Sequence, residues 1–254
     1  MFPYIEQPAL TIGSHTIYAF GILVGIGVVV GFEIIVRRAP KAGLDGREAA
    51  RLAVWTLIWA LVGSHVFSVV AYSPELLKAH PLEIFKFWGS MSNIGGITGG
   101  MLGGWVVMKR RGVSRAAMAG FLDSLAFAFP FGEIFGRGGC ALAHDHLGIE
   151  STHWLAVQFP GGSRFDLGLL EFLSFLVIAG AFFLLDRRRW PSGFFLGLFF
   201  TLYGPVRFAL YTLRIGEARY FGWTPAQYLS LIGTLAGVAV LVALLRGMYS
   251  SPKE

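Results

Sequence analysis

Cysteine and charged residues are both scarce in this chain. Its 254 residues include one cysteine, and only 14% of them are Asp, Glu, Lys or Arg. One cysteine excludes an internal disulfide, and a soluble domain usually carries about 25% charged residues. Because 55% of the residues are hydrophobic and the mean hydropathy is +0.63, the composition indicates an integral membrane protein.

Long apolar runs, by contrast, are abundant. Seven runs approach or reach the roughly 17–25 residues that a spanning helix needs, and the third is the shortest and rich in glycine. We therefore expect an all-α integral membrane protein with seven transmembrane helices, in which residues 1–254 form a single polytopic membrane domain. The expected spans are 17–36, 52–72, 92–108, 116–135, 168–185, 193–212 and 226–246.

Basic residues gather in the loops after the first, third and fifth spans. This alternation follows the positive-inside rule and predicts an external N-terminus and a cytoplasmic C-terminus. The net charge of +6 therefore indicates membrane lipid rather than nucleic acid as the partner. The loop residues are Arg37, Arg38, Lys41, Arg47 and Arg51, then Lys109, Arg110, Arg111 and Arg115, then Arg187, Arg188 and Arg189.

Several ionisable residues interrupt the apolar runs, and such residues at membrane depth are candidate functional groups. Arg137 follows the fourth run and needs an anionic partner, a carboxylate or a lipid phosphate, unless it reaches the interface. Arg207, Tyr211 and Arg214 fall on one helical face of the sixth span, which predicts an anion site. The carboxylates Asp123, Glu133 and Glu171 are expected to pair with arginines.

A histidine cluster follows Arg137. His144, Asp145 and His146 form the only cluster with a possible general base near neutral pH. Adjacent His-Asp-His residues chelate a metal poorly, and the spacing of Cys140 to His144 is a weak metal signal, so no metal site is predicted. In the third run, Gly95 and Gly96 begin a series of glycine pairs that predicts tight helix packing, or alternatively the smooth wall of a lipid cavity.

These residues resemble the motifs of the bacterial prolipoprotein diacylglyceryl transferases over nearly the whole chain. The family's seven-span topology with an external N-terminus agrees with the one expected from charge. The matching segments are Asp123 with Gly136-Arg137-Gly138-Gly139, Asp145 and Gly148; Tyr203-Gly204-Pro205-Val206-Arg207-Phe208 with Arg214; Gln227-Tyr228-Leu229-Ser230; and Met91-Ser92 with Gly95-Gly96.

The resemblance implies transfer of the diacylglyceryl group of phosphatidylglycerol to the lipobox cysteine of preprolipoproteins, without a cofactor. A thioether forms and glycerol 1-phosphate leaves. The enzyme would lie in the bacterial inner membrane with its active site toward the periplasm, and Arg137 and Arg207 would stabilise the departing phosphate. The implied substrate-binding residues are Gly95, Gly96, Gly139, Cys140, Gly148, Glu171, Tyr203 and Arg214.

The chain departs from the family pattern at several polar positions. The family's histidine before the glycine pair is Ile94, a first-helix tyrosine is Phe20, and a signature asparagine is Cys140. We expect His144 or His146, oriented by Asp145, to replace the missing base. Two alternatives remain open: a divergent paralogue that acts on another thiol or phospholipid, and a non-catalytic membrane protein that binds anionic lipid.

Overall fold

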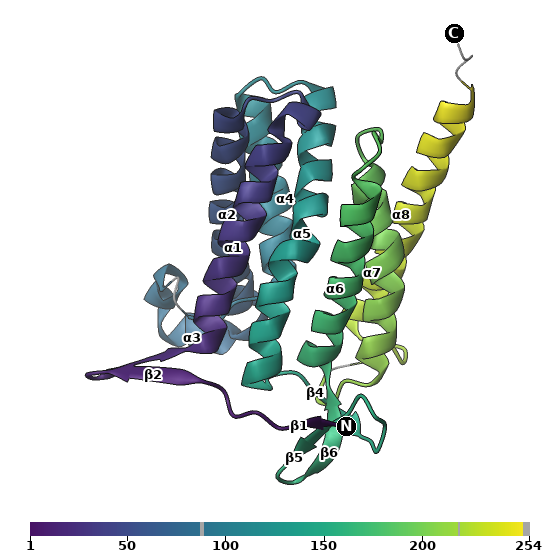
Figure 1. Cartoon of the computed structure of the whole chain (residues 1–254). Helices are drawn as coiled ribbons and strands as arrows, with labels where there is room; N and C mark the ends of the chain where they lie inside the picture. Colours follow the sequence, from purple (N-terminus) through teal and green to yellow (C-terminus); the bar gives the residue numbers. More distant parts are fainter. Residues whose placement is uncertain (87–88, 218, 251–254) are drawn as a thin grey trace. The chain divides into compact units, whose positions relative to one another are not determined.

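The fold is mostly helical (Figure 1), and the computed structural model describes residues 1–86, 89–217 and 219–250. The helices are α1 (Ala19–Arg38), α2 (Gly46–Phe67), α3 (Pro74–Ala79), α4 (Asn93–Arg110), α5 (Arg115–Ala143), α6 (Leu167–Leu185), α7 (Phe194–Thr212) and α8 (Pro225–Ser250). Three short helical segments are η1 (Ala39–Ala42), η2 (Ser68–Tyr72) and η3 (Pro81–Phe85). The strands are β1 (Phe2–Pro3), β2 (Ala9–Ile12), β3 (His15–Tyr18), β4 (Leu147–Glu150), β5 (Val157–Phe159) and β6 (Gly162–Asp166).

Six helices in the described part of the chain are long and apolar enough to cross a membrane: α1, α2, α5, α6, α7 and α8. They coincide with six of the seven expected spans, which confirms a helical integral membrane protein. The remaining expected span, 92–108, forms α4 but is not among the six. Seven crossings therefore stay a prediction.

Helix α5 is longer than the sequence analysis predicted. The expected span ended at residue 135, whereas the helix continues to Ala143 and includes Arg137 and Cys140. Glycine weakens a helix by about 1 kcal/mol relative to alanine, but a backbone at membrane depth must satisfy its own hydrogen bonds. The glycines also permit close contacts, since a Cβ on Gly139 would lie 3.0 Å from Cδ2 of Phe20 in α1.

The chain divides into two compact units, and the unit of residues 35–121 is organised around α2 and α4. A Cβ added to Gly99 would lie 2.5 Å from the Trp59 carbonyl oxygen and 2.8 Å from Cα of Gly63. An added Cβ on Gly95 would collide with Gly63, and one on Gly96 would contact Ser64. These close approaches confirm the predicted tight packing by the glycine pairs.

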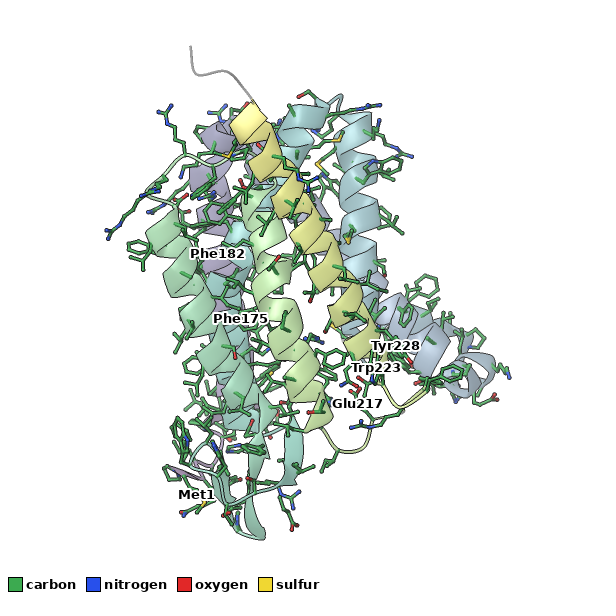
Figure 2. The ribbon with its side chains drawn as sticks, turned by 90° about the vertical axis from the view of Figure 1, so that its right-hand side faces the viewer. Met1, Phe175, Phe182, Glu217, Trp223 and Tyr228 are labelled. Atoms are coloured by element: carbon green, nitrogen blue, oxygen red, sulfur yellow. The ribbon has the colours of Figure 1, made fainter. Side chains whose placement is uncertain are left out.

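The second unit comprises residues 1–34 and 122–254. Its apolar core is aromatic and joins α5, α6 and α7; Figure 2 labels Phe175 and Phe182 of α6. Asp123 of α5 is buried in this unit and accepts a hydrogen bond of 3.0 Å from the backbone N of Leu196. Asp123 thus caps the first turn of α7, where backbone N–H groups lack helical partners.

Two small sheets add to the helices and were not predicted. One is a hairpin of β2 and β3; the other has the order β1-β5-β6-β4, in which β1 runs parallel to β5 and the other pairs are antiparallel. Strands of two to five residues are too short to show an alternating pattern. The second sheet orders most of the loop between α5 and α6, and Gly148 pairs with Arg214 beside it.

The contact between α5 and α6 gives a stability prediction. Gly168→Ala should lower the free energy of unfolding by about 1–3 kcal/mol through overpacking, because its Cβ would lie 2.9 Å from backbone atoms of Cys140 and Ala141. Gly180→Ala in the same helix meets nothing within 4 Å and should raise it by about 0.4–1 kcal/mol. Unfolding of the detergent-purified variants measures both, and equal effects would contradict the packing argument.

Candidate active site

Arg137 lies between two carboxylates in the second unit. Its Nε is 3.0 Å from Oε2 of Glu133, four residues earlier on α5, and its Nη1 is 2.5 Å from Oε2 of Glu171 on α6. The side chain of Glu171 is only 3% exposed and that of Arg137 12%. Arg137 therefore has the anionic partners that a cation in a dry site requires.

Arg207 of α7 contacts the other oxygen of the same carboxylate. Its Nη1 lies 3.4 Å from Oε1 of Glu171 and donates to the Tyr203 hydroxyl at 2.9 Å, and that hydroxyl donates to Oε1 of Glu171 at 2.8 Å. Nη2 of Arg207 donates to the Tyr211 hydroxyl at 3.0 Å. Glu171 is thus the shared centre of the two arginines that the sequence analysis selected.

The network continues past the end of α7 to Arg214. Nη1 of Arg214 donates to the Tyr211 hydroxyl at 3.3 Å, and its Nε lies 3.0 Å from Oε1 of Glu217. Tyr203, Arg207 and Tyr211 share one face of α7 because their spacing follows the helical repeat. Arg214 lies beyond the end of the helix at Thr212, where it pairs with Gly148, so the predicted helical face ends at Tyr211. We call the whole set the arginine network; its members are Glu133, Arg137, Glu171, Tyr203, Arg207, Tyr211, Arg214 and Glu217.

His144 belongs to a separate cluster at the end of α5. Its Nδ1 lies 2.5 Å from Oδ2 of Asp166, its Nε2 lies 3.0 Å from the carbonyl oxygen of Ile5, and its ring stacks on Tyr4. Asp166, and not the expected Asp145, orients this imidazole. Because each ring nitrogen already has a hydrogen-bond partner, neither is open to a substrate.

His144 also has an unfavourable backbone conformation. Its φ is 52°, in the left-handed region that a residue with a Cβ adopts at a cost of about 1–3 kcal/mol. This conformation ends α5 and turns the chain toward Asp145 and His146.

Asp166 also caps α6 through the backbone N of Leu169 at 3.1 Å. Burial raises the pKa of Asp166, although its hydrogen bond with His144 acts in the opposite direction.

His146 is the histidine that Asp145 orients. Its Nδ1 lies 2.5 Å from Oδ1 of Asp145. Partial burial alone would raise the pKa of Asp145, but the hydrogen bond and the charge of His146 outweigh it and lower that pKa. One donor atom each of Cys140, Asp145 and His146 lies within 4.8 Å of the others. Among the described residues, this is the one group of at least three His, Cys, Asp or Glu side chains close enough to share a metal ion.

Gly148, which was expected to bind substrate, lies at a crowded point of the backbone. Its added Cβ would lie 3.0 Å from Cβ of Phe165 and 3.2 Å from the carbonyl oxygen of Leu213. The neighbouring Ile149 N donates to that same carbonyl at 2.9 Å. Gly148 thus allows β4 to pack closely against the end of α7.

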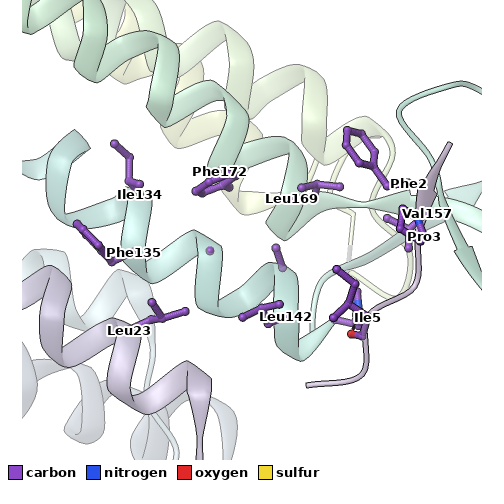
Figure 3. Close-up of a pocket in the computed structure, with 13 residues that line it drawn as sticks. Phe2, Pro3, Ile5, Leu23, Ile134, Phe135, Leu142, Val157, Leu169 and Phe172 are labelled. Carbon is purple, nitrogen blue, oxygen red and sulfur yellow. Dashed lines mark hydrogen bonds between the residues drawn. The ribbon is translucent and has the colours of Figure 1, made fainter. Parts of the chain in front are cut away.

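An apolar cavity of about 410 Å³ lies within the second unit (Figure 3). It lies between the N-terminal segment, α1, α5 and α6, and His144 is among its lining residues. Gly138 and Ala141 of α5 also line it, whereas their neighbours Arg137 and Cys140 belong to the polar clusters. One helix therefore separates an apolar cavity from charged groups. Labelled lining residues in Figure 3 include Ile5, Leu23, Phe135, Leu142 and Phe172.

Sequence reasoning missed two residues of these clusters. Asp166 was not selected, yet an aspartate directly before an apolar helix is an N-cap signal. Glu217 carried no signal, because it lies outside the apolar runs. Both contacts depend on loops whose course the sequence does not specify.

The six apolar helices and the buried arginine network define a polytopic membrane protein with a charged site inside one unit. The chain belongs to the prolipoprotein diacylglyceryl transferase family, whose model matches residues 7–243. This confirms the family suggested by the sequence motifs, and with it the enzyme class, a transferase of lipoprotein biosynthesis.

Similar proteins span the whole chain. A phosphatidylglycerol–prolipoprotein diacylglyceryl transferase of Frankia alni is 30% identical and covers 100% of this chain and 71% of its own. A protein of the same name from Pseudomonas paraeruginosa is 29% identical over 99% of this chain and 98% of its own. Another, from Nitratidesulfovibrio vulgaris, is 27% identical over 94% and 95%.

Proposed function

We propose that this protein transfers the diacylglyceryl group of phosphatidylglycerol to the lipobox cysteine thiol of preprolipoproteins. The observation that carries the proposal is the meeting of Arg137 and Arg207, both at motif positions of the family, on the buried carboxylate of Glu171. Family membership supports this reaction, and the arginine network provides positive charge suited to the phosphate of the donor lipid.

The reaction moves negative charge onto a phosphate. The thiolate sulfur attacks the glycerol carbon that carries the phosphate ester, a C–S bond forms and the C–O bond breaks. The bonding electrons leave with the phosphate oxygen, and glycerol 1-phosphate is released. A phosphodiester carries one negative charge, whereas the released monoester carries about 1.5 to 2 at neutral pH. Stabilisation of this developing charge accelerates the step.

Arg137 and Arg207 are the groups that provide this stabilisation. A guanidinium has five N–H donors, and the hydrogen bonds to Glu133, Glu171 and the two tyrosines engage only part of them. The carboxylates fix the direction of both guanidinium groups before lipid binds. Preorganised charges of this kind need no rearrangement during the reaction, which is where their catalytic advantage arises.

The acceptor thiol must lose its proton, because the thiolate is the nucleophile. His146, oriented by Asp145, is the group that accepts this proton in our proposal. His144 instead positions the turn, since both of its ring nitrogens are engaged. The cavity lined by Gly138 and Ala141 holds one acyl chain of the donor lipid, because it is apolar and adjoins the arginine-bearing helix.

The site faces the periplasm in this proposal, in a seven-span protein of the bacterial inner membrane. Arg187, Arg188 and Arg189 follow the C-terminal end of α6, whereas Glu171 lies in its first turns. A helix of 19 residues is about 28 Å long. Because basic loops face the cytoplasm, Glu171 and its partners would lie near the outer surface.

Transfer can be measured directly with the purified full chain. Incubation with phosphatidylglycerol and a lipobox peptide should yield a peptide heavier by one diacylglyceryl group and an equal amount of glycerol phosphate. A peptide with serine in place of the cysteine is the matched control and should stay unmodified. Lipid binding without turnover would favour the non-catalytic alternative, and turnover with a small thiol alone would favour the divergent paralogue.

The role of His146 gives a further prediction. His146→Gln should reduce transfer at neutral pH by about 10²–10⁴-fold, the usual contribution of a general base. The loss should shrink as pH rises toward the thiol pKa of about 8.5, because solvent then supplies the thiolate. The exposed His153, whose ring accepts a hydrogen bond from the backbone N of Leu155, gives the control variant His153→Gln. A pH-independent loss would contradict the role of a base.

A further inference from the structure

We infer that Cys140, Asp145 and His146 form a binding site for a divalent transition metal ion of the zinc class. The three donors are a thiol, a carboxylate and an imidazole, which are the ligand types of protein zinc sites. They lie within 4.8 Å of one another at the end of α5. In the sequence, the weak metal signal was the spacing of Cys140 to His144. In the structure His146 lies near Cys140 instead, because the backbone of His144 turns the chain and its ring contacts Asp166.

The distances are close to those of a coordinated ion. Zinc–sulfur and zinc–nitrogen bonds of about 2.3 and 2.0 Å place tetrahedral donors about 3.3–3.7 Å apart. Side-chain rotations that move each donor atom by about 1 Å would therefore bring the three donors onto one ion. His146 and Asp145 already face one another, with Nδ1 2.5 Å from Oδ1, and an ion bound by both side chains would take the place of this hydrogen bond.

The surroundings balance the charge of such an ion. A Cys140 thiolate and the Asp145 carboxylate together neutralise a dication. Arg137, one turn before Cys140, is the neighbouring cation, and it is already paired with Glu133 and Glu171. Cys140 is buried while Asp145 is exposed, so an ion can reach the site from one side and remain partly shielded from water.

Three protein ligands leave the fourth position of a tetrahedral ion open, as in catalytic zinc sites. This consequence rests on the proposed transferase function. A thiol that coordinates zinc gives up its proton, so a lipobox cysteine in the open position would become a thiolate and release that proton to solvent. The ion would then perform the deprotonation that His146 performs in metal-free protein.

Metal binding is testable without any substrate. The detergent-purified full chain should retain one Zn²⁺ per chain after dialysis against trace zinc, and Co²⁺ should produce a thiolate-to-cobalt charge-transfer band. Cys140→Ala, Asp145→Asn and His146→Gln should each weaken Zn²⁺ affinity at least 10-fold, and the first should abolish the band. His153→Gln, outside the cluster, is the control and should bind as the unmodified protein does.

A second measurement uses the unmodified protein and so does not depend on whether a variant folds. Cys140 is the only cysteine, so Zn²⁺ should slow its reaction with a thiol reagent in the unmodified protein, whereas Mg²⁺ should not. Absence of the charge-transfer band, or unchanged zinc affinity in a folded Cys140→Ala protein, would overturn the inference. Because no step involves lipid or peptide, either result is independent of the transferase assay.

Discussion

Replacing Arg207 by alanine is expected to slow diacylglyceryl transfer by about 10²–10³-fold, the loss seen when one preorganised donor to a developing negative charge is removed. Arg207 contacts Glu171, Tyr203 and Tyr211, so its guanidinium is fixed before the lipid arrives. The loss should fall on kcat more than on KM, because the phosphate gains charge only as the ester bond breaks. Steady-state rates with phosphatidylglycerol and a lipobox peptide measure it.

Two other variants test whether the loss of transfer rate is specific to the guanidinium group of Arg207. Arg207→Lys keeps the charge but loses the planar fork, and it should recover only part of the rate. Arg214→Ala removes an arginine just beyond the end of α7 that pairs with Glu217 at the edge of the network, and its effect should be smaller. Equal losses for Arg207→Ala and Arg214→Ala would contradict a specific role for Arg207 at the phosphate.

Glu171→Gln is expected to lower the free energy of unfolding by about 3–5 kcal/mol, the cost of removing one partner from a buried ion pair. Its carboxylate is 3% exposed and faces two arginines, so its loss leaves positive charge in a dry site. Thermal or chemical unfolding of the purified protein in one detergent measures this difference against the unmodified chain.

The matched control for Glu171 is Glu133→Gln. Glu133 is 25% exposed and pairs with Arg137 alone, and Arg137 keeps Glu171 when Glu133 is changed. We expect a loss of about 1 kcal/mol or less, as for a solvent-accessible pair. If the two variants were equally unstable, Glu171 would have no special position as the shared counter-charge.

Much of this structure follows from periodicity that a single sequence displays. Apolar runs of sufficient length predicted the six candidate spanning helices, because a membrane allows few other backbones. The spacing of Arg207 and Tyr211 predicted one face of α7, which their hydrogen bond confirms. Arg214, expected on the same face, lies beyond the end of the helix. The helical repeat was sufficient to predict contacts between residues of one helix.

Contacts between distant segments were not predictable in the same way. His144 bonds to Asp166 and to the carbonyl of Ile5, which are 22 and 139 residues away, and no local pattern encodes such pairs. The approach of Asp145 and His146 to Cys140 depends on the left-handed backbone of His144, a conformation that is uncommon for residues other than glycine. Both features arise where α5 ends, beyond the helical repeat.

The parallel pairing of β1 with β5 bears on the number of membrane crossings between these two strands. Phe2 is paired with Val157 in one sheet, so the two strands would occupy the same side of a bilayer. In a bilayer, the chain would then cross an even number of times between them. Three of the six candidate spans, α1, α2 and α5, lie in that interval, so the seven-span prediction, which adds α4, would satisfy this condition.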